Sequence, residues 1–166
     1  TVRAAPGLDA YLELLEERLE RSVGSHPGLV GEIGADTLSA GGKRLRPVLV
    51  FLCTPAGERA GERAVAGGAS VELVHMATLV HDDLVDGARM RRGAPAAWSA
   101  FGPDEALSAG DYLFACAFSE LAARIRAIAR REAGMREPVL DTRGLELDPN
   151  TNHVRREGRE IHLTPK

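Results

Sequence analysis

The sequence has few aromatic residues, 4% of the total, and only two cysteines, Cys53 and Cys116. No stretch approaches the ~18 consecutive apolar residues of a membrane-spanning helix. The first residues, TVRAAPGLDAYLELLEERLE, are charged and amphipathic and do not resemble a secretory signal peptide. Each cysteine stands alone in an apolar context, so we predict that both pack in the core of a cytoplasmic protein. These absences argue against a membrane span and against secretion.

Apolar residues make up 44% of the 166 residues, and alanine, leucine and valine dominate them, which favours helices in a domain of moderate size. Charge is uneven along the chain. Residues 1–122 carry 11 basic and 17 acidic side chains, whereas residues 123–166 carry 10 basic and 7 acidic ones. This asymmetry predicts two parts with different partners.

Apolar spacing in the first part predicts helices over 8–22, 28–40, about 67–86 and 103 to about 129. Gly41-Gly42 suits the end of the second helix, and Pro47 suits the first turn of another. The third helix is expected to bury a stripe of four residues, Val71, Val74, Thr78 and Val85. No strand is predicted before about residue 129.

The tail alternates in short runs and is rich in turn residues. HVRREGREIHL predicts a hairpin that turns at Glu157-Gly158, and VLDTRGLEL predicts one or two earlier strands. Thr164-Pro165-Lys166 is typical of a helix start, with a threonine N-cap and proline in the first helical position. Because the sequence stops there, we interpret the chain as truncated.

The stretch HDDLVDGARMRRG places three carboxylates near a helix end. Asp82 and Asp86 share a helix face and Asp83 is adjacent, so the three repel one another. The helix dipole also disfavours anions at a C-terminus, by ~0.3–1 kcal/mol each. A hard cation such as Mg²⁺ would relieve this repulsion by taking carboxylate and phosphate oxygens. The alternative is a solvated acidic helix end.

Two basic clusters favour a metal-bound diphosphate as the ligand of the three carboxylates, over a solvated acidic helix end. Arg91 and Arg92 follow the carboxylates, and guanidinium groups suit bidentate contacts with phosphate. Upstream, GGKRLRP places Lys43, Arg44 and Arg46 where a glycine-containing turn meets a helix N-terminus, which also favours anions. Taken alone, this segment is better explained as a basic, solvated linker. Together the three clusters predict one metal-bound diphosphate and a second diphosphate bound without metal.

GGKRLRP, VELVHMATLVHDDLVDGARMRRG and FGPDEALSAGDYLFACAF, at these spacings, resemble the N-terminal part of a trans-isoprenyl diphosphate (polyprenyl) synthase over residues 8–122. The resemblance implies a mainly α fold, the N-terminal part of the all-helical isoprenoid synthase bundle. The tail pattern adds a short antiparallel β-hairpin and strand segment after it. It implies a Mg²⁺-dependent prenyltransferase of isoprenoid biosynthesis that adds isopentenyl diphosphate to an allylic prenyl diphosphate. A homodimer is one assembly that we consider.

The resemblance also implies residue roles. The catalytic and metal-binding residues would be Asp82, Asp83 and Asp86. Arg91 would contact the allylic diphosphate, and isopentenyl diphosphate would be held by Lys43, Arg46, His75 and Arg92. Ala77 and Thr78 would form the floor of the product cavity, and their small size predicts a long-chain polyprenyl product unless another residue blocks the cavity. His81 is expected to be structural.

The resemblance has limits. Members of this family carry a second aspartate-rich motif, whereas Asp104, Asp111, Asp141 and Asp148 are isolated here. We therefore expect this chain to be a weak or inactive catalyst alone. Residues 123–137 and 138–166 resemble the linker and strand platform of an OmpR/PhoB-type response regulator.

The tail leaves several interpretations open. They are a fused, frameshifted or misassembled reading frame, or a divergent synthase region. The alternative function is a DNA-binding regulator fragment, although its recognition helix would follow Lys166.

Overall fold

The computed structural model describes residues 5–132, 140–142, 145–148, 153–156 and 159–161. Contacts divide the chain into two compact units, Thr1–Ile125 and Arg126–Lys166.

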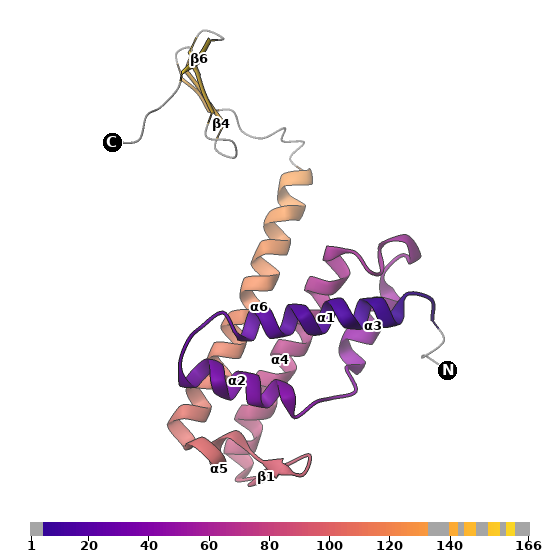
Figure 1. The fold of residues 1–166 in the computed structure, drawn as a ribbon, viewed down its shortest axis with the longest axis vertical. Coiled ribbons are helices and arrows are strands. Elements are labelled where there is room, and N and C mark those ends of the chain that lie inside the picture. The colour runs from indigo at the N-terminus through magenta and orange to yellow at the C-terminus, as the bar shows by residue number, and fades with distance from the viewer. Residues whose placement is uncertain (1–4, 133–139, 143–144, 149–152, 157–158, 162–166) are drawn as a thin grey trace. The chain divides into compact units, whose positions relative to one another are not determined.

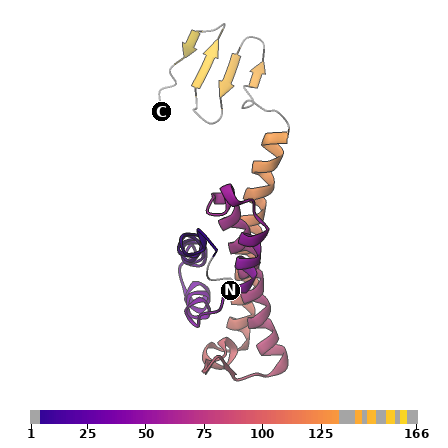
Figure 2. The same ribbon diagram turned by 90° about the vertical axis from the view of Figure 1, so that its right-hand side faces the viewer.

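The first unit is helical. Its elements are α1 (Leu8–Val23), α2 (Leu29–Ser39), α3 (Leu45–Cys53), a short 3₁₀ turn (Ala56–Glu58), α4 (Glu62–Asp86), β1 (Met90–Arg91), β2 (Ala94–Pro95), α5 (Ala97–Phe101) and most of α6 (Pro103–Glu132). Figures 1 and 2 show α1 and α2 lying side by side across a second layer that contains α4 and the first part of α6. The long helix α4 therefore carries residues from the core to the end of the unit where the β1–β2 hairpin lies.

The core forms where amphipathic α1 meets α4. The apolar face of α1 is buried, and it consists of Leu8, Tyr11, Leu15, Leu19 and Val23. From α4 the core takes a run dominated by small residues, with Ala69, Leu73, Met76, Ala77 and Val80. Burial of this apolar surface is the main stabilising contribution to the unit. The predicted stripe on α4 is wrong in phase, because Val85 is 83% exposed and Val71 is 36% exposed.

The predicted helices 8–22 and 28–40 are confirmed to within about one residue at each end. Helix α4 begins at Glu62 rather than near Gly67, because tertiary packing overrides the weak helix propensity of glycine. Pro47 is the third residue of α3 and so lies in its first turn, as predicted.

The β1–β2 hairpin was not expected from the sequence. Its strands have two residues each, too short for a periodic pattern, and pair Met90 with Pro95 and Arg91 with Ala94. The turn places Arg92 and Gly93 at positive φ, 51° and 84°. The hairpin therefore depends on backbone conformations that arginine adopts rarely.

Adjacent glycines in α4 give opposite predictions. A Cβ on Gly68 would overlap the Tyr11 hydroxyl and lie 3.3 Å from Leu15 Cδ1, whereas one on Gly67 would make ordinary contact with Val50 at 3.5 Å. We expect Gly68→Ala to lower the free energy of unfolding by ~1–3 kcal/mol through overpacking. Gly67→Ala should raise it by ~0.5–1 kcal/mol, since alanine is the better helix former. Urea denaturation measures both, and equal effects would contradict the packing described here.

The second unit contains a four-stranded antiparallel sheet in the order β3-β4-β5-β6, with β3 (Leu140–Thr142), β4 (Leu145–Asp148), β5 (His153–Arg156) and β6 (Arg159–Ile161). The pairing of β5 with β6 confirms the predicted hairpin strands, and β3 with β4 confirms two earlier strands. The predicted turn at Glu157-Gly158 and the helix start at 164–166 lie outside the described residues.

The two cysteines differ in environment. Cys116 is buried, as predicted, but Cys53 at the end of α3 is exposed, so the prediction that both pack in the core is wrong for Cys53. The pKa of the Cys116 thiol is raised by burial. Among the described residues, no helix is both long and apolar enough to cross a membrane.

Candidate active site

The end of α4 divides its three aspartates between two environments. Asp82 and Asp86, four residues apart, are exposed, whereas Asp83 is 4% exposed and faces inward. Gly87, at φ 65°, then ends the helix with its N–H bonded to the carbonyls of Asp83 and Leu84. The helical period thus places one pair of carboxylates toward solvent and one carboxylate inside.

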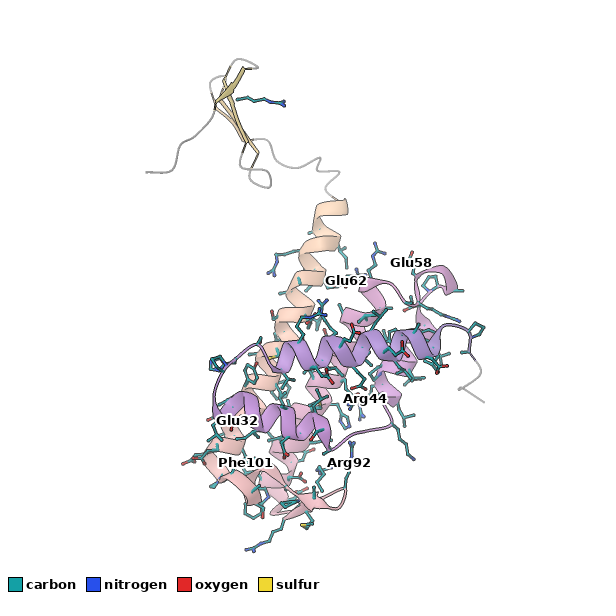
Figure 3. The ribbon with its side chains drawn as sticks, in the orientation of Figure 1. Glu32, Arg44, Glu58, Glu62, Arg92 and Phe101 are labelled. Atoms are coloured by element: carbon teal, nitrogen blue, oxygen red, sulfur yellow. The ribbon has the colours of Figure 1, made fainter. Side chains whose placement is uncertain are left out.

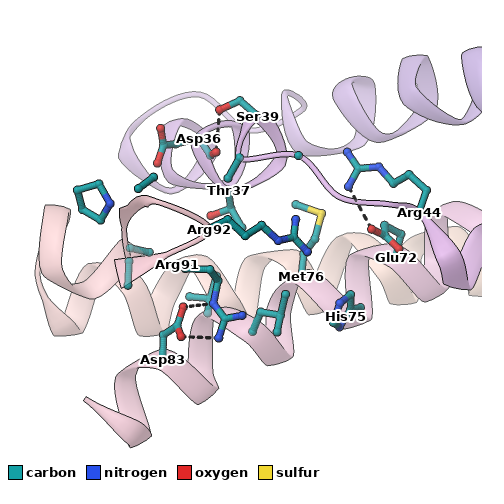
Figure 4. A pocket seen from close by; sticks show the side chains of 18 residues that line it. Asp36, Thr37, Ser39, Arg44, Glu72, His75, Met76, Asp83, Arg91 and Arg92 are labelled. Atoms are coloured by element: carbon teal, nitrogen blue, oxygen red, sulfur yellow. Dashed lines mark hydrogen bonds and ion pairs between the residues drawn. The ribbon is translucent and has the colours of Figure 1, made fainter. Parts of the chain in front are cut away.

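The inward carboxylate is paired with the hairpin. Both Asp83 carboxylate oxygens accept hydrogen bonds from the Arg91 guanidinium, through Nε and Nη2 (Figure 4). The pKa of Arg91 is raised by the hydrogen bond to Asp83, and the charges of Asp83, Asp82 and Asp86 act in the same direction. This bidentate pair fixes the hairpin to the end of α4.

Two of the three predicted metal-binding carboxylates, those of Asp82 and Asp86, are exposed together, whereas the third, that of Asp83, is paired with Arg91. Within the described ranges, no three His, Cys, Asp or Glu side chains are grouped so that they could hold a metal ion. Asp82 and Asp86 nevertheless offer two exposed carboxylates one helical turn apart. Mg²⁺ commonly takes one or two carboxylates and completes its shell with water and phosphate oxygens, so this donor pair suits it.

A basic hollow lies beside this region. We use the term basic hollow for the cavity of about 540 Å³ whose lining includes Lys43, Arg46, His75 and Arg92. These side chains come from three segments, namely the loop into α3 together with the first turn of α3, the middle of α4, and the turn of the hairpin. All four residues that the resemblance assigns to isopentenyl diphosphate therefore converge on one cavity.

The chemistry of the basic hollow suits an anion. The pKa of His75 is lowered, first by burial and then by the charge of Arg46, with Arg92 and Arg91 adding to the effect and Glu72 opposing it. The imidazole is thus kept neutral near pH 7 as a hydrogen-bonding group, while the arginines and the lysine carry the positive charge.

A smaller cavity of about 110 Å³ adjoins the basic hollow. Both cavities are lined by Arg44, Glu72, His75 and Arg92, and the smaller one adds Asp83 and Arg91 (Figure 4). The predicted binding residues at the two diphosphate positions therefore lie along one continuous surface.

Four predicted site residues lie outside the lining of these two cavities. Asp82 and Asp86 line neither cavity. Ala77 is fully buried in the core, and Thr78 is partly buried with its hydroxyl donating to the His75 carbonyl at 2.8 Å.

The role of Glu72 could not be predicted from the sequence. A single glutamate in an apolar helix gives no signal, yet its carboxylate is buried and accepts a hydrogen bond from Arg44 at 3.1 Å. By contrast, His81 fits the predicted structural role: its ring packs near Phe114, and Nε2 lies 3.2 Å from the Leu107 carbonyl.

Comparison with known proteins identifies the family. The polyprenyl synthetase family model matches residues 28–137. The heptaprenyl diphosphate synthase component 2 of Geobacillus stearothermophilus is 44% identical over 111 residues, which is 67% of this chain and 35% of that protein. The chain thus spans about a third of the length of this curated relative.

Solved structures give the same result. The heptaprenyl diphosphate synthase of Staphylococcus aureus aligns with a TM-score of 0.66 and 30% identity, over 74% of this chain and 41% of that one. A polyprenyl synthase from Caulobacter crescentus, solved with calcium and isoprenyl diphosphate, aligns with a TM-score of 0.52 and 31% identity over 74% and 38%.

The family match also corrects a boundary. It includes residues 123–137, so the predicted likeness of this segment to a response-regulator linker is not supported. Residues 138–166 lie beyond the match. Since the family model covers more than half of the chain, this protein belongs to the polyprenyl synthetase family.

Proposed function

We propose that this chain forms the diphosphate-binding part of a prenyltransferase that adds isopentenyl diphosphate to an allylic prenyl diphosphate. The observation that carries the proposal is the convergence of Lys43, Arg46, His75 and Arg92 on the basic hollow. A region with this charge, next to an exposed pair of carboxylates, suits two diphosphates, one of them bound with a cation.

In this proposal each group has a separate task. Asp82 and Asp86 hold Mg²⁺, which when bound stabilises the negative charge that develops on the departing diphosphate. Arg91 orients the allylic diphosphate, and the basic hollow holds isopentenyl diphosphate without metal. The solved relative with calcium and isoprenyl diphosphate supports this combination of ligands. Asp83, the third predicted metal-binding residue, joins them when it releases Arg91.

The reaction forms one carbon–carbon bond and breaks one carbon–oxygen bond. The allylic diphosphate leaves as pyrophosphate, the double bond of isopentenyl diphosphate attacks the resulting cation, and a proton is lost from the adduct. The cationic side chains of the chain act by holding the two diphosphates in register, so positioning and electrostatics provide most of the acceleration.

We propose a long-chain product for the parent activity. Ala77 and Thr78, the predicted floor residues, are small, and the matched heptaprenyl synthase component supports the proposal. A growing prenyl chain meets no ring at these positions, and burial of each added unit favours further growth.

The basic hollow is tested by binding of isopentenyl diphosphate without metal. We expect Arg46→Gln to weaken the affinity measured by calorimetry about tenfold, the size typical of a lost charge-assisted hydrogen bond. Arg63→Gln is the control, because Arg63 pairs with Glu58 at an exposed site outside the lining of the basic hollow. Unchanged affinity in Arg46→Gln would contradict this use of the basic hollow.

We infer that the protein is cytoplasmic and forms a homodimer. Large exposed apolar side chains on α6, Phe118 and Ile125 at 64% and 61%, support a self-association surface.

For residues 138–166 the alternative of a DNA-binding regulator is kept as a second proposal. The four-stranded antiparallel order of β3–β6 supports it. Titration of duplex DNA against the chain tests this alternative, and no binding at low salt would reject it.

A further inference from the structure

Arg44 differs from its basic neighbours. In GGKRLRP, Lys43 and Arg46 are exposed, whereas Arg44 is only 9% exposed. Its Nε and Nη2 donate to the two carboxylate oxygens of Glu16 at 2.7 and 3.0 Å, and its Nη1 donates to Glu72 at 3.1 Å. The guanidinium is therefore directed at two carboxylates, one from α1 and one from α4.

Glu72 is an unexpected residue at an anion site. Its side chain is 5% exposed, it precedes His75 by one helical turn, and it lines the basic hollow. A carboxylate on this wall repels a bound diphosphate and attracts the same cations that the diphosphate needs. The hydrogen bond from Arg44 holds this carboxylate and offsets its charge.

The loop before α3 is shaped around the Arg44 guanidinium. A Cβ on Gly42 would lie 3.1 Å from Nη1 of Arg44 and 3.0 Å from Nη1 of Arg92. Figure 3 shows that these two arginines lie on separate segments of the chain. Arg44 also occupies the left-handed region, φ 48°, where a non-glycine residue is uncommon. The backbone at Gly42 thus passes close to two guanidiniums, and only Arg44 is bonded to carboxylates in the described contacts.

We propose that Arg44 is a positioning residue that acts through Glu72. By holding the Glu72 carboxylate, it keeps Lys43, Arg46 and Arg92 available to a diphosphate. Arg44 itself contacts no substrate in this proposal. The inference rests on the proposed function of the basic hollow as a diphosphate site.

The test uses the full chain and inorganic pyrophosphate without metal, measured by calorimetry. We expect Arg44→Gln to weaken binding about tenfold or more, as when one partner of a buried charge pair is truncated. The double variant Arg44→Gln with Glu72→Gln should recover to within about threefold of the original affinity, because the carboxylate that competes for the cations is gone.

Arg18 provides a matched control. It also donates a bidentate pair to one carboxylate, Glu120, and a third hydrogen bond to another, Glu62, but it does not line the basic hollow. Arg18→Gln should therefore lower thermal stability as Arg44→Gln does, with pyrophosphate affinity unchanged. Equal losses of affinity in both variants would overturn the proposal, since the effect would then be general destabilisation.

A second readout is the pKa of His75 by NMR. Arg46, Arg92 and Arg91 lower this pKa, and Glu72 raises it. In Arg44→Gln the unpaired Glu72 should raise it further, and the double variant should reverse the change. An unchanged pKa in folded Arg44→Gln would contradict a role through Glu72.

The remaining outcomes distinguish a failure of this inference from a failure of the proposed function. If Arg44→Gln does not fold, the double variant decides, and a tenfold loss there would show that Arg44 binds the anion directly. Full binding by Arg44→Gln would also overturn the inference. If the unaltered chain binds no pyrophosphate, the proposed function itself fails and this inference fails with it.

Discussion

Replacing Asp83 by asparagine should lower the free energy of unfolding by ~2–3 kcal/mol, whereas the same change at the neighbouring Asp82 should alter it by less than ~0.5 kcal/mol. Asp83 is buried and paired with Arg91 through both oxygens, and Asp82 is exposed. The Arg91 side chain is 35% exposed, which places the expected loss below that of a fully buried pair. Urea denaturation followed by circular dichroism measures both values.

The pair can be isolated by a double-mutant cycle. Asp83→Asn combined with Arg91→Gln should cost less than the sum of the single changes, because each removes the same interaction. Strict additivity would show that the two side chains do not interact as described. A large loss of stability in Asp82→Asn would contradict the division of the acidic cluster into one inward and two outward carboxylates.

A graft of residues 1–122 onto a related complete synthase should make mainly long-chain products. Ala77→Phe in that graft should shift them to shorter chains, because a ring at this position would fill space that the growing prenyl chain needs. Separation of the products by chain length gives the result. A farnesyl-length product from the unaltered graft would reject the proposed product class.

The control for this experiment is the thermal stability of each variant, which shows whether the fold is retained. Ala77 is fully buried, so a larger side chain can also overpack the core, at ~1–3 kcal/mol. Thr78→Phe offers a second variant at a partly buried position. Shortened products with retained thermal stability in either variant separate a change of cavity from a loss of folding, while unchanged products in both would contradict the assignment.

Local residue chemistry predicted part of the arrangement. The spacing of Asp82 and Asp86 predicts a shared helix face, on which both are exposed, and the glycine-containing turn before α3 predicts a cluster of basic side chains, of which Lys43 and Arg46 line one cavity. The use of these groups for a metal ion and diphosphates stays a prediction. The partners of the buried charges were not predictable. Arg44 bonds to Glu16, which lies 28 positions before it, and to Glu72, which lies 28 positions after it. No local pattern encodes such contacts.

The sequence-based predictions of the fold failed mainly for the buried face of α4 and for the short strands of the hairpin. The buried face of α4 is rich in small residues such as Ala69 and Ala77, which give weak periodicity, so the sequence pattern favours the stripe through Val71 and Val85. The two-residue strands of the hairpin carry no alternation to detect. Burial of Cys53 was inferred from apolar neighbours, although α3 exposes Leu45, Leu49 and Leu52 as well.

Asp82 and Asp86 are proposed to bind a cation together with a diphosphate. Calorimetry of an allylic diphosphate against the full chain, with and without Mg²⁺, is the decisive experiment. We expect binding that is clearly stronger with Mg²⁺, and we expect this gain to be lost in Asp82→Ala while the fold, followed by circular dichroism, is kept. Equal heats in the two conditions, or an undiminished Mg²⁺ effect in Asp82→Ala, would contradict the claim.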